Sequence, residues 1–409
     1  MKGDEDIRRS IVKFAGEKLL CNAFPSSTES VAALCHVQKM ACISVCMPLE
    51  FNLRSRSMEK TLVEKHLRVC LHVDPGFETA VTIAPSEPLL AEASSLIMSD
   101  PAFDLPRHLL KELENRGLDK GNRGELIGMA LCLLARDAAA KKLRKRIIPV
   151  STFIQELVVS DDILTSMPIH ARTSDEAQKN FEDTFTDSNI FFNHFVKFRD
   201  RGVINRRYLW RLIARGAVGL CADFQFGVDI VIPFLFWDRR LRRVNVSAIF
   251  IQCKNDGSFQ ITPRLYLFDM MHPFHIQFFD EKETDLVPVI RMVFALASPD
   301  AGVVVLQAPE RVQPPRDTAF KARFQADKFT SFDIWCAKAS KMTFCPVKED
   351  EIFQKLLLRF RIFPDVYDVK RTEGLRNVTR SMNPGTALHA AHYCNLRRAY
   401  ISNKVSQVV

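Results

Sequence analysis

The spacing of apolar positions predicts mostly helices in the first part of the chain. Residues 87–99 repeat apolar side chains at helical spacing. Residues 66–88 instead fit a β-hairpin, because the Asp-Pro-Gly sequence at 74–76 favours a turn between two apolar runs. We therefore expect a mostly helical region over residues 1–115. Nothing in its sequence indicates its role.

A second helical pattern covers residues 121–146. Apolar residues surround nearly the whole helix between Leu126 and Leu134, so its first half should be buried. The pattern ends in the basic run 141–146, and cations suit the C-terminus of a helix. Helical patterns continue up to Gly216 and predict a helical insertion over residues 150–215. Its four expected helices are 151–160, 175–185, 189–200 and 205–216.

The pattern then changes to short apolar runs bounded by Pro, Gly and Asn, which is typical of strands. Six strands are expected, at residues 217–225, 227–236, 245–255, 288–298, 302–308 and 331–339. A helix at 348–360 and a polar tail from about residue 370 follow. Helices and strands together predict an α+β (α/β) fold built on a mixed sheet.

Composition restricts the class of protein only loosely. The chain has 409 residues, of which 47% are hydrophobic and 26% charged, and this is ordinary for a globular protein of two or three domains. The net charge of +9 suits a polyanionic partner without requiring one. The sequence has no HExxH, Walker A, GxSxG or GxGxxG motif, which argues against the common metalloproteases, P-loop ATPases, hydrolases and dehydrogenases.

Cysteine usage indicates the compartment. The 11 cysteines are odd in number and several lie in apolar runs, as Cys132 and Cys221 do, so we expect free thiols in a reducing environment. The first residues lack the apolar core of a signal peptide, and no run reaches the about 18 apolar residues of a membrane span. We expect an intracellular protein, cytoplasmic or nuclear, with no membrane partner.

Two of the predicted strands carry charged and amide side chains. Asp229 lies among apolar residues in the first strand, and the second ends in Gln252 and Lys254, which share one face by alternation. A connecting loop centred near Leu241 places Asp229 opposite residues 252–254, although the register decides on which face. Pro233 indicates a bulge or a sheet edge. A buried charge needs a compensating partner, and a metal ion is one candidate.

These three side chains suit phosphodiester chemistry. The carboxylate of Asp229 and the amide oxygen of Gln252 are hard ligands of the kind that Mg²⁺ prefers, and Mn²⁺ would serve similarly. Lys254 could position or deprotonate a water molecule, or neutralise charge on the transition state. A metal-bound water attacking a phosphodiester is the matching reaction.

The pattern D-x(n)-Q-x-K across a hairpin resembles the PD-(D/E)XK nuclease superfamily. The string IFIQCKN is similar to its Mrr-type restriction endonuclease branch, which has Gln in place of the usual acid. The resemblance implies an α-β-β-β-α-β core, here over residues 116–345, and an auxiliary acid on the first helix, for which Glu125 is the candidate. It implies Glu125, Asp229 and Gln252 as metal ligands and Lys254 as a catalytic residue. The whole chain also resembles uncharacterised proteins of basidiomycete fungi.

The sequence predicts a metal-dependent endonuclease, acting on DNA rather than RNA. Residues 1–115 and 346–409 would supply substrate choice or partner contacts, and a homodimer is compatible with the sequence. Val228 replaces the motif proline, and Gln252 removes one negative charge. These departures keep open an inactive nuclease-like fold that acts as a nucleic-acid-binding or protein-interaction module.

Structural alternatives exist for each candidate residue. Asn122 and Glu125 match a helix capping box, Asp229 could cap a turn, and Gln252 with Lys254 could be the solvated end of a strand. The basic residues of the hairpin loop could bind phosphates, as could the run 141–146, which also fits a nuclear import signal. A solvated face is the commoner role for such basic residues. The loop residues are Arg239, Arg240, Arg242 and Arg243.

Overall fold

The computed structural model describes residues 2–49, 56–73, 80–113, 118, 120–222, 225–237, 240–307 and 327–358. Residues 1–358 form one compact unit. The polar tail expected from about residue 370 and the loop residue Arg239 lie outside the described residues.

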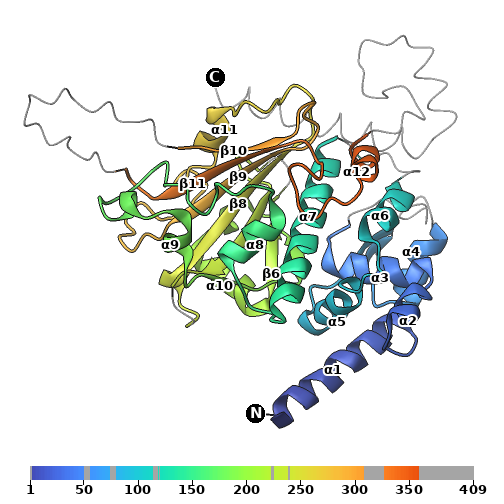
Figure 1. Cartoon of the computed structure of the whole chain (residues 1–409). Helices are drawn as coiled ribbons and strands as arrows, with labels where there is room; N and C mark the ends of the chain where they lie inside the picture. The colour runs from blue at the N-terminus through green and yellow to red at the C-terminus, as the bar shows by residue number, and fades with distance from the viewer. Residues whose placement is uncertain are drawn as a thin grey trace, which may run out of the picture. The chain divides into compact units, whose positions relative to one another are not determined.

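The N-terminal region is helical with one hairpin, as predicted (Figure 1). Strands β1 and β2 pair antiparallel, with Val69 opposite Ile83, which confirms the predicted hairpin. The region contains α1 (Lys2–Leu20), α2 (Thr28–Ala32), α3 (His36–Cys46), α4 (Arg56–Lys65), β1 (Val69–Val73), β2 (Ala80–Ile83), α5 (Pro88–Met98) and α6 (Leu105–Leu113). Within the described residues, no helix has both the length and the apolar character to cross a membrane.

A nine-stranded mixed sheet follows, and the six strands predicted from residue 217 onward are confirmed. The sheet runs in the order β10-β11-β9-β8-β7-β4-β3, with β6 also paired to β7 and β5 to β6. Its strands are β3 (Ile148–Pro149), β4 (Asn189–Ile190), β5 (His194–Lys197), β6 (Ala217–Leu220), β7 (Ile230–Leu235), β8 (Val246–Lys254), β9 (Val289–Ala295), β10 (Gly302–Val305) and β11 (Ser331–Ala337).

The strand directions form two groups. Strands β6, β7 and β8 are antiparallel neighbours, whereas β8, β9 and β11 run parallel. Parallel strands are usually covered on both faces, which explains why β8, β9 and β11 are nearly continuous apolar runs.

Helices cover both faces of this sheet (Figure 1). On one face, α7 packs so closely that a Cβ on Gly128 would lie 2.6 Å from Sγ of Cys253. On the other face, Phe250 contacts Phe278, which lies beyond α11 (ring centroids 5.1 Å apart). The remaining described helices are α7 (Lys120–Leu143), α8 (Val150–Leu157), α9 (Phe181–Phe185), α10 (Arg206–Arg215), α11 (Leu265–Met270), α12 (Asp350–Leu357) and three short 3-10 turns at Glu176–Gln178, Arg201–Val203 and Arg243–Asn245.

The predicted helix at 189–200 is wrong. This segment forms β4 and β5 instead, and β5 pairs in parallel with β6. Phe192, Phe195 and Phe198 are buried three residues apart, which looked helical, but aromatic residues also favour strands and the sheet ladder decides here. The expected insertion at 150–215 is therefore mixed. Its helices at α8 and α10 are confirmed, and 175–185 holds two short helical turns.

Pro233 lies in an internal strand and needs no bulge. It is opposite Ala248 of β8. On its other side, β7 pairs with β6 as far as Val231 and with β4 only at Leu235. The proline therefore falls between two neighbours, where its missing N–H removes no sheet hydrogen bond on that side.

A buried ion pair connects two parallel strands. Arg291 on β9 is opposite Asp333 on β11, and two hydrogen bonds join them, Nε to Oδ1 at 2.7 Å and Nη2 to Oδ2 at 2.6 Å. Arg291 also donates to the carbonyl oxygen of Phe268 in α11, and Ser331 donates to Asp333. The pair therefore fastens α11 to the sheet.

Candidate functional site

Asp229 stands directly before the first paired residue of β7. Its backbone N–H donates to the carbonyl oxygen of Ile251 at 2.9 Å, and Oδ2 accepts a hydrogen bond from the backbone N–H of Cys253 at 2.7 Å. The carboxylate therefore lies at the backbone between Gln252 and Lys254. Just before it, Gly227 has φ +83 and faces the backbone of Met270, so only glycine fits there.

Gln252 lacks the hydrogen-bond partner that its buried position would require. Gln252 is 3% exposed, and its Oε1 is buried without a hydrogen-bond partner among the described residues. An unsatisfied buried polar atom costs about 1–3 kcal/mol. Lys254 is half-buried at the end of β8, and its ammonium makes no hydrogen bond or ion pair with the rest of the described chain. A solvated strand end does not describe Gln252.

Glu125 reaches the same region from α7. The preceding Gly124 packs on Asn255, with its would-be Cβ 3.2 Å from the Asn255 Cβ. Burial raises the pKa of the Cys221 and Cys253 thiols well above the usual value, and the carboxylates of Asp229 and Glu125 both add to this rise. Both carboxylates are thus within electrostatic range of the same two thiols.

The capping alternative for Glu125 does not hold in the form expected. Helix α7 already includes Lys120, so Asn122 lies inside the helix rather than at its N-cap. Cys221 and Cys253 are neighbours of the carboxylates that sequence reasoning treated only as core. Alternation along β8 placed Cys253 on the other face, and no signal pointed to Cys221.

Burial raises the pKa of Asp229 to about 6, opposed by the Cys253 N–H and the Lys254 ammonium. In the unfolded chain the carboxyl of Asp229 loses its proton near pH 3.8, whereas in the folded chain it keeps it up to about pH 6. The free energy of unfolding therefore falls as pH rises from about 4 to about 6, and it stays lower above pH 6. Asp229→Asn should therefore be more stable than the wild type at pH 7.5 by about 1–3 kcal/mol, and about equal at pH 4. Urea unfolding in EDTA at both values measures this.

Asp256→Asn is the matched control for this prediction. The Ser258 N–H and Lys120 hold the pKa of Asp256 at about 2, so its charge favours the folded state above about pH 4. Its removal should leave stability at pH 7.5 unchanged or lower. Equal free energies of unfolding for the wild type and Asp229→Asn at pH 7.5 would contradict the prediction, because they would show that the buried charge of Asp229 does not destabilise the fold.

The candidate site fits a hard divalent cation in one respect. Within the described residues, no three His, Cys, Asp or Glu side chains are arranged to hold a metal ion. The candidate residues instead carry two carboxylates and an amide, and the buried amide oxygen of Gln252 lacks a hydrogen-bond partner among the described residues. A Mg²⁺ or Mn²⁺ ion would supply that partner.

The basic loop lies at the opposite end of the hairpin. Leu235 of β7 pairs with Val246 of β8, six strand positions from Asp229, which is about 20 Å. Arg242 and Arg243 are exposed there, as is Arg240. These arginines could contact a long polyanion but not the atoms that Asp229 would act on.

The basic run 141–146 takes part in the fold. Nζ of Lys142 is 2.7 Å from Oε1 of Glu156, and Arg146 forms an ion pair with Glu92. Two of its cations thus bind acids of this chain, which favours a structural role for them.

Residues 22–281 match the family model described as "Domain of unknown function (DUF8736)". The match begins after α1, includes α2–α6 and the β7–β8 hairpin, and ends before β9. No curated protein and no solved structure matches the chain. Because the model covers more than half of its 409 residues, the chain belongs to the DUF8736 family.

Proposed function

We propose that this chain is a metal-dependent nucleic-acid phosphodiesterase, an endonuclease acting on DNA rather than RNA. The observation that carries the proposal is the buried, unpartnered Oε1 of Gln252 next to Asp229 and Lys254. A fold keeps such an atom at a cost of about 1–3 kcal/mol, and a bound cation would offset that cost.

The order of elements supports the proposal. The resemblance to the PD-(D/E)XK superfamily implies an α-β-β-β-α-β core. Elements α7, β6, β7, β8, α11 and β9 follow one another in this order, with α8–α10 and β3–β5 inserted between α7 and β6. Asp229 at the start of β7 and Gln252 and Lys254 at the end of β8 meet at one end of the hairpin.

Each residue has a role in the proposed reaction. Asp229, Gln252 and Glu125 would hold a Mg²⁺ or Mn²⁺ ion, whose charge would stabilise the phosphate and make a bound water acidic. Lys254 lies close enough to Asp229 to lower its pKa, so its ammonium can also position a water or neutralise charge on the phosphate. Protonation of Asp229 below about pH 6 would weaken metal binding and activity.

The test uses the full chain, supercoiled plasmid and Mg²⁺ or Mn²⁺. We expect nicking by the wild type that EDTA abolishes and that falls at least about a hundredfold in Lys254→Ala. Lys348→Ala, which removes an exposed lysine elsewhere, should nick like the wild type.

The outcomes separate the proposal from its alternative. Cleavage that persists in Lys254→Ala would assign the activity to another site or a contaminant. A gel shift of DNA without cleavage by any variant would favour the inactive nuclease-like module, in which Gln252 and Val228 mark the loss of the catalytic motif.

A further inference from the structure

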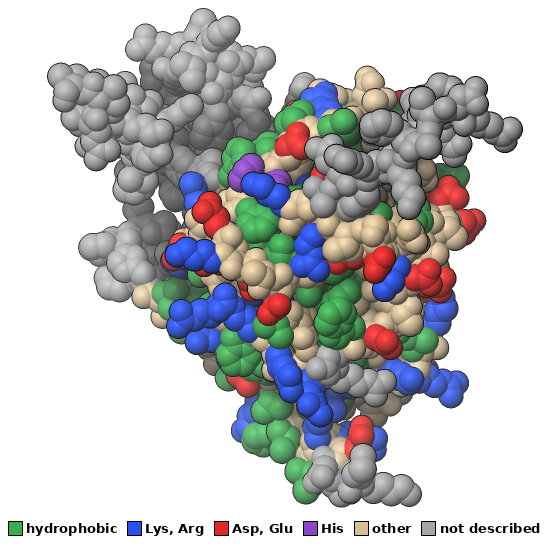
Figure 2. Space-filling model, turned by 90° about the vertical axis from the view of Figure 1, so that its left-hand side faces the viewer, with side chains coloured by type: hydrophobic (Ala, Val, Ile, Leu, Met, Phe, Trp, Pro, Cys, Tyr) green, Lys and Arg blue, Asp and Glu red, His purple; other side chains and the backbone are tan. Residues whose placement is uncertain are grey.

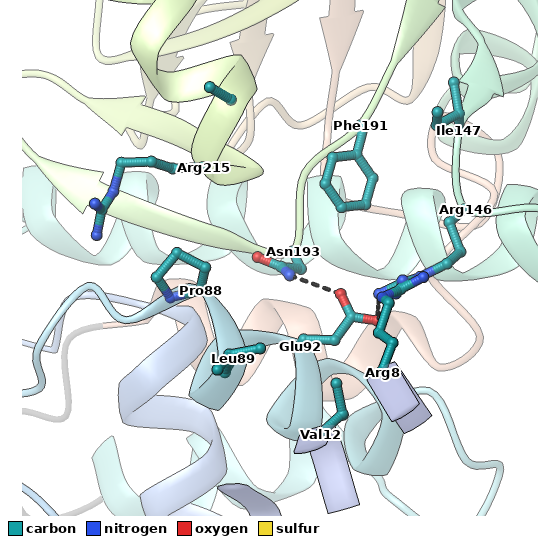
Figure 3. A pocket seen from close by; sticks show the side chains of 11 residues that line it. Arg8, Val12, Pro88, Leu89, Glu92, Arg146, Ile147, Phe191, Asn193 and Arg215 are labelled. Atoms are coloured by element: carbon teal, nitrogen blue, oxygen red, sulfur yellow. Dashed lines mark hydrogen bonds and ion pairs between the residues drawn. The ribbon is translucent and has the colours of Figure 1, made fainter. Parts of the chain in front are cut away.

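A pocket lies at the end of α7 away from the candidate site (Figure 3). It has a volume of about 390 Å³, within the range of small-molecule sites. Five segments line it: α1, α5, the residues after α7, the segment leading into β5, and the end of α10. Glu125 and Arg146 are separated by roughly 30 Å along the helix direction, so the pocket is a separate site.

Positive charge exceeds negative charge in this pocket. Its lining includes three arginines, Arg8, Arg146 and Arg215, and a single acid. That acid is Glu92, which is 9% exposed. Nη2 of Arg8 is 3.4 Å from Oε1 of Glu92, and Arg146 bonds to the same oxygen. Figure 3 shows both guanidinium groups directed at this carboxylate. Two cations sharing one carboxylate leave an excess of one positive charge at that point, and Arg215, which donates to the Ser86 carbonyl, adds a second positive charge elsewhere in the lining.

The remaining walls are apolar. Asn193 is the one neutral polar residue of the lining, and its groups are engaged: Nδ2 donates to Glu92 at 3.0 Å, and Oδ1 is 2.7 Å from Nδ1 of His194. A sugar or a base would find few hydrogen-bond partners here. The apolar lining residues are Val12, Pro88, Leu89, Ile147, Phe191 and Ala214.

We propose that this pocket binds a small organic monoanion, a carboxylate with an aliphatic body. The single excess charge at Arg8 and Arg146 matches one carboxylate, and the apolar walls match a hydrocarbon chain. Arg8 is the recruiting residue, because it is half-exposed and its 3.4 Å contact with Glu92 is loose. When the Arg8 guanidinium moves from Glu92 to the ligand, the Glu92 carboxylate still has its ion pair with Arg146 and its hydrogen bond from Asn193.

Calorimetric titration of the full chain tests this with three probes. Octanoate should bind at one site, whereas 1-octanol, which has the same chain without the charge, and inorganic phosphate, which has charge without the chain, should bind at least about tenfold more weakly. In Arg8→Gln the affinity for octanoate should fall about tenfold, since one charge-assisted hydrogen bond is lost.

Two further variants keep the result interpretable. Leu89→Gln, at a half-exposed wall residue, should weaken octanoate without moving the unfolding midpoint. Arg211→Gln removes an exposed arginine from the same helix as Arg215 but outside the pocket, and should bind like the wild type. Equal binding of octanol and octanoate, unchanged affinity in Arg8→Gln, or stronger binding of phosphate would each overturn the proposal. None of these results bears on the nuclease proposal.

Discussion

Asp333→Ala is expected to lower the free energy of unfolding by about 3–5 kcal/mol. The substitution leaves the Arg291 guanidinium buried, with the Phe268 carbonyl as its remaining hydrogen-bond partner in the described chain. An uncompensated buried charge is far more costly than the pair itself is stabilising. Urea unfolding followed by circular dichroism measures the change.

A double variant distinguishes the lost pair from lost packing. Arg291→Met combined with Asp333→Leu removes both charges and should recover most of the stability, because apolar side chains of similar size replace a costly buried pair. Glu351→Ala, in an exposed pair with Lys355, should leave stability almost unchanged, because water screens such a pair. A loss below about 1 kcal/mol in Asp333→Ala would contradict the burial seen here.

Gln252→Leu is expected to have opposite effects on stability and activity. In EDTA the variant should be about 1 kcal/mol more stable than the wild type, because leucine removes the unsatisfied Oε1. Stabilisation by Mg²⁺ should disappear, and metal-dependent nicking should fall at least about a hundredfold. Thermal unfolding with and without Mg²⁺, together with the plasmid assay, measures both effects.

Gln252→Glu is the informative comparison. It restores the acid usual in the resembling superfamily and adds a buried charge, so it should be less stable than the wild type in EDTA and gain more from Mg²⁺. A Gln252→Leu variant that is destabilised in EDTA and keeps its response to Mg²⁺ would make Gln252 an ordinary structural residue.

The strands from Ala217 onward could be predicted because their signals are local. In β8, uninterrupted apolar residues from Ala248 to Ile251 have a single common explanation, a strand covered on both faces. The segment of β5 lacks such a signal, since Phe192, Phe195 and Phe198 suit either a helix or a strand. The strand is determined by its pairing with β6, a contact between segments that are apart in the sequence and that local patterns do not reveal.

The candidate site was predictable as a neighbourhood but not as a geometry. Alternation in β8 and the length of the loop bring Asp229 near Gln252 and Lys254. The hydrogen bond from the Cys253 N–H to Asp229 depends on where the pairing of β7 with β8 stops. The sequence does not predict that position. The pocket at Glu92 was missed because its residues come from five separate segments.

The parallel pairing of β8 with β9 has a consequence for making the protein. Residues Ile249–Lys254 of β8 pair with β9, which begins 35 residues later (289 − 254). A ribosome needs about 2–7 s to add 35 residues, and during that time β8 presents an apolar open edge to other nascent chains. A fragment ending at residue 281, where the family match ends, would keep that edge open permanently. Recombinant work on this family should therefore extend at least through β11 to obtain soluble protein.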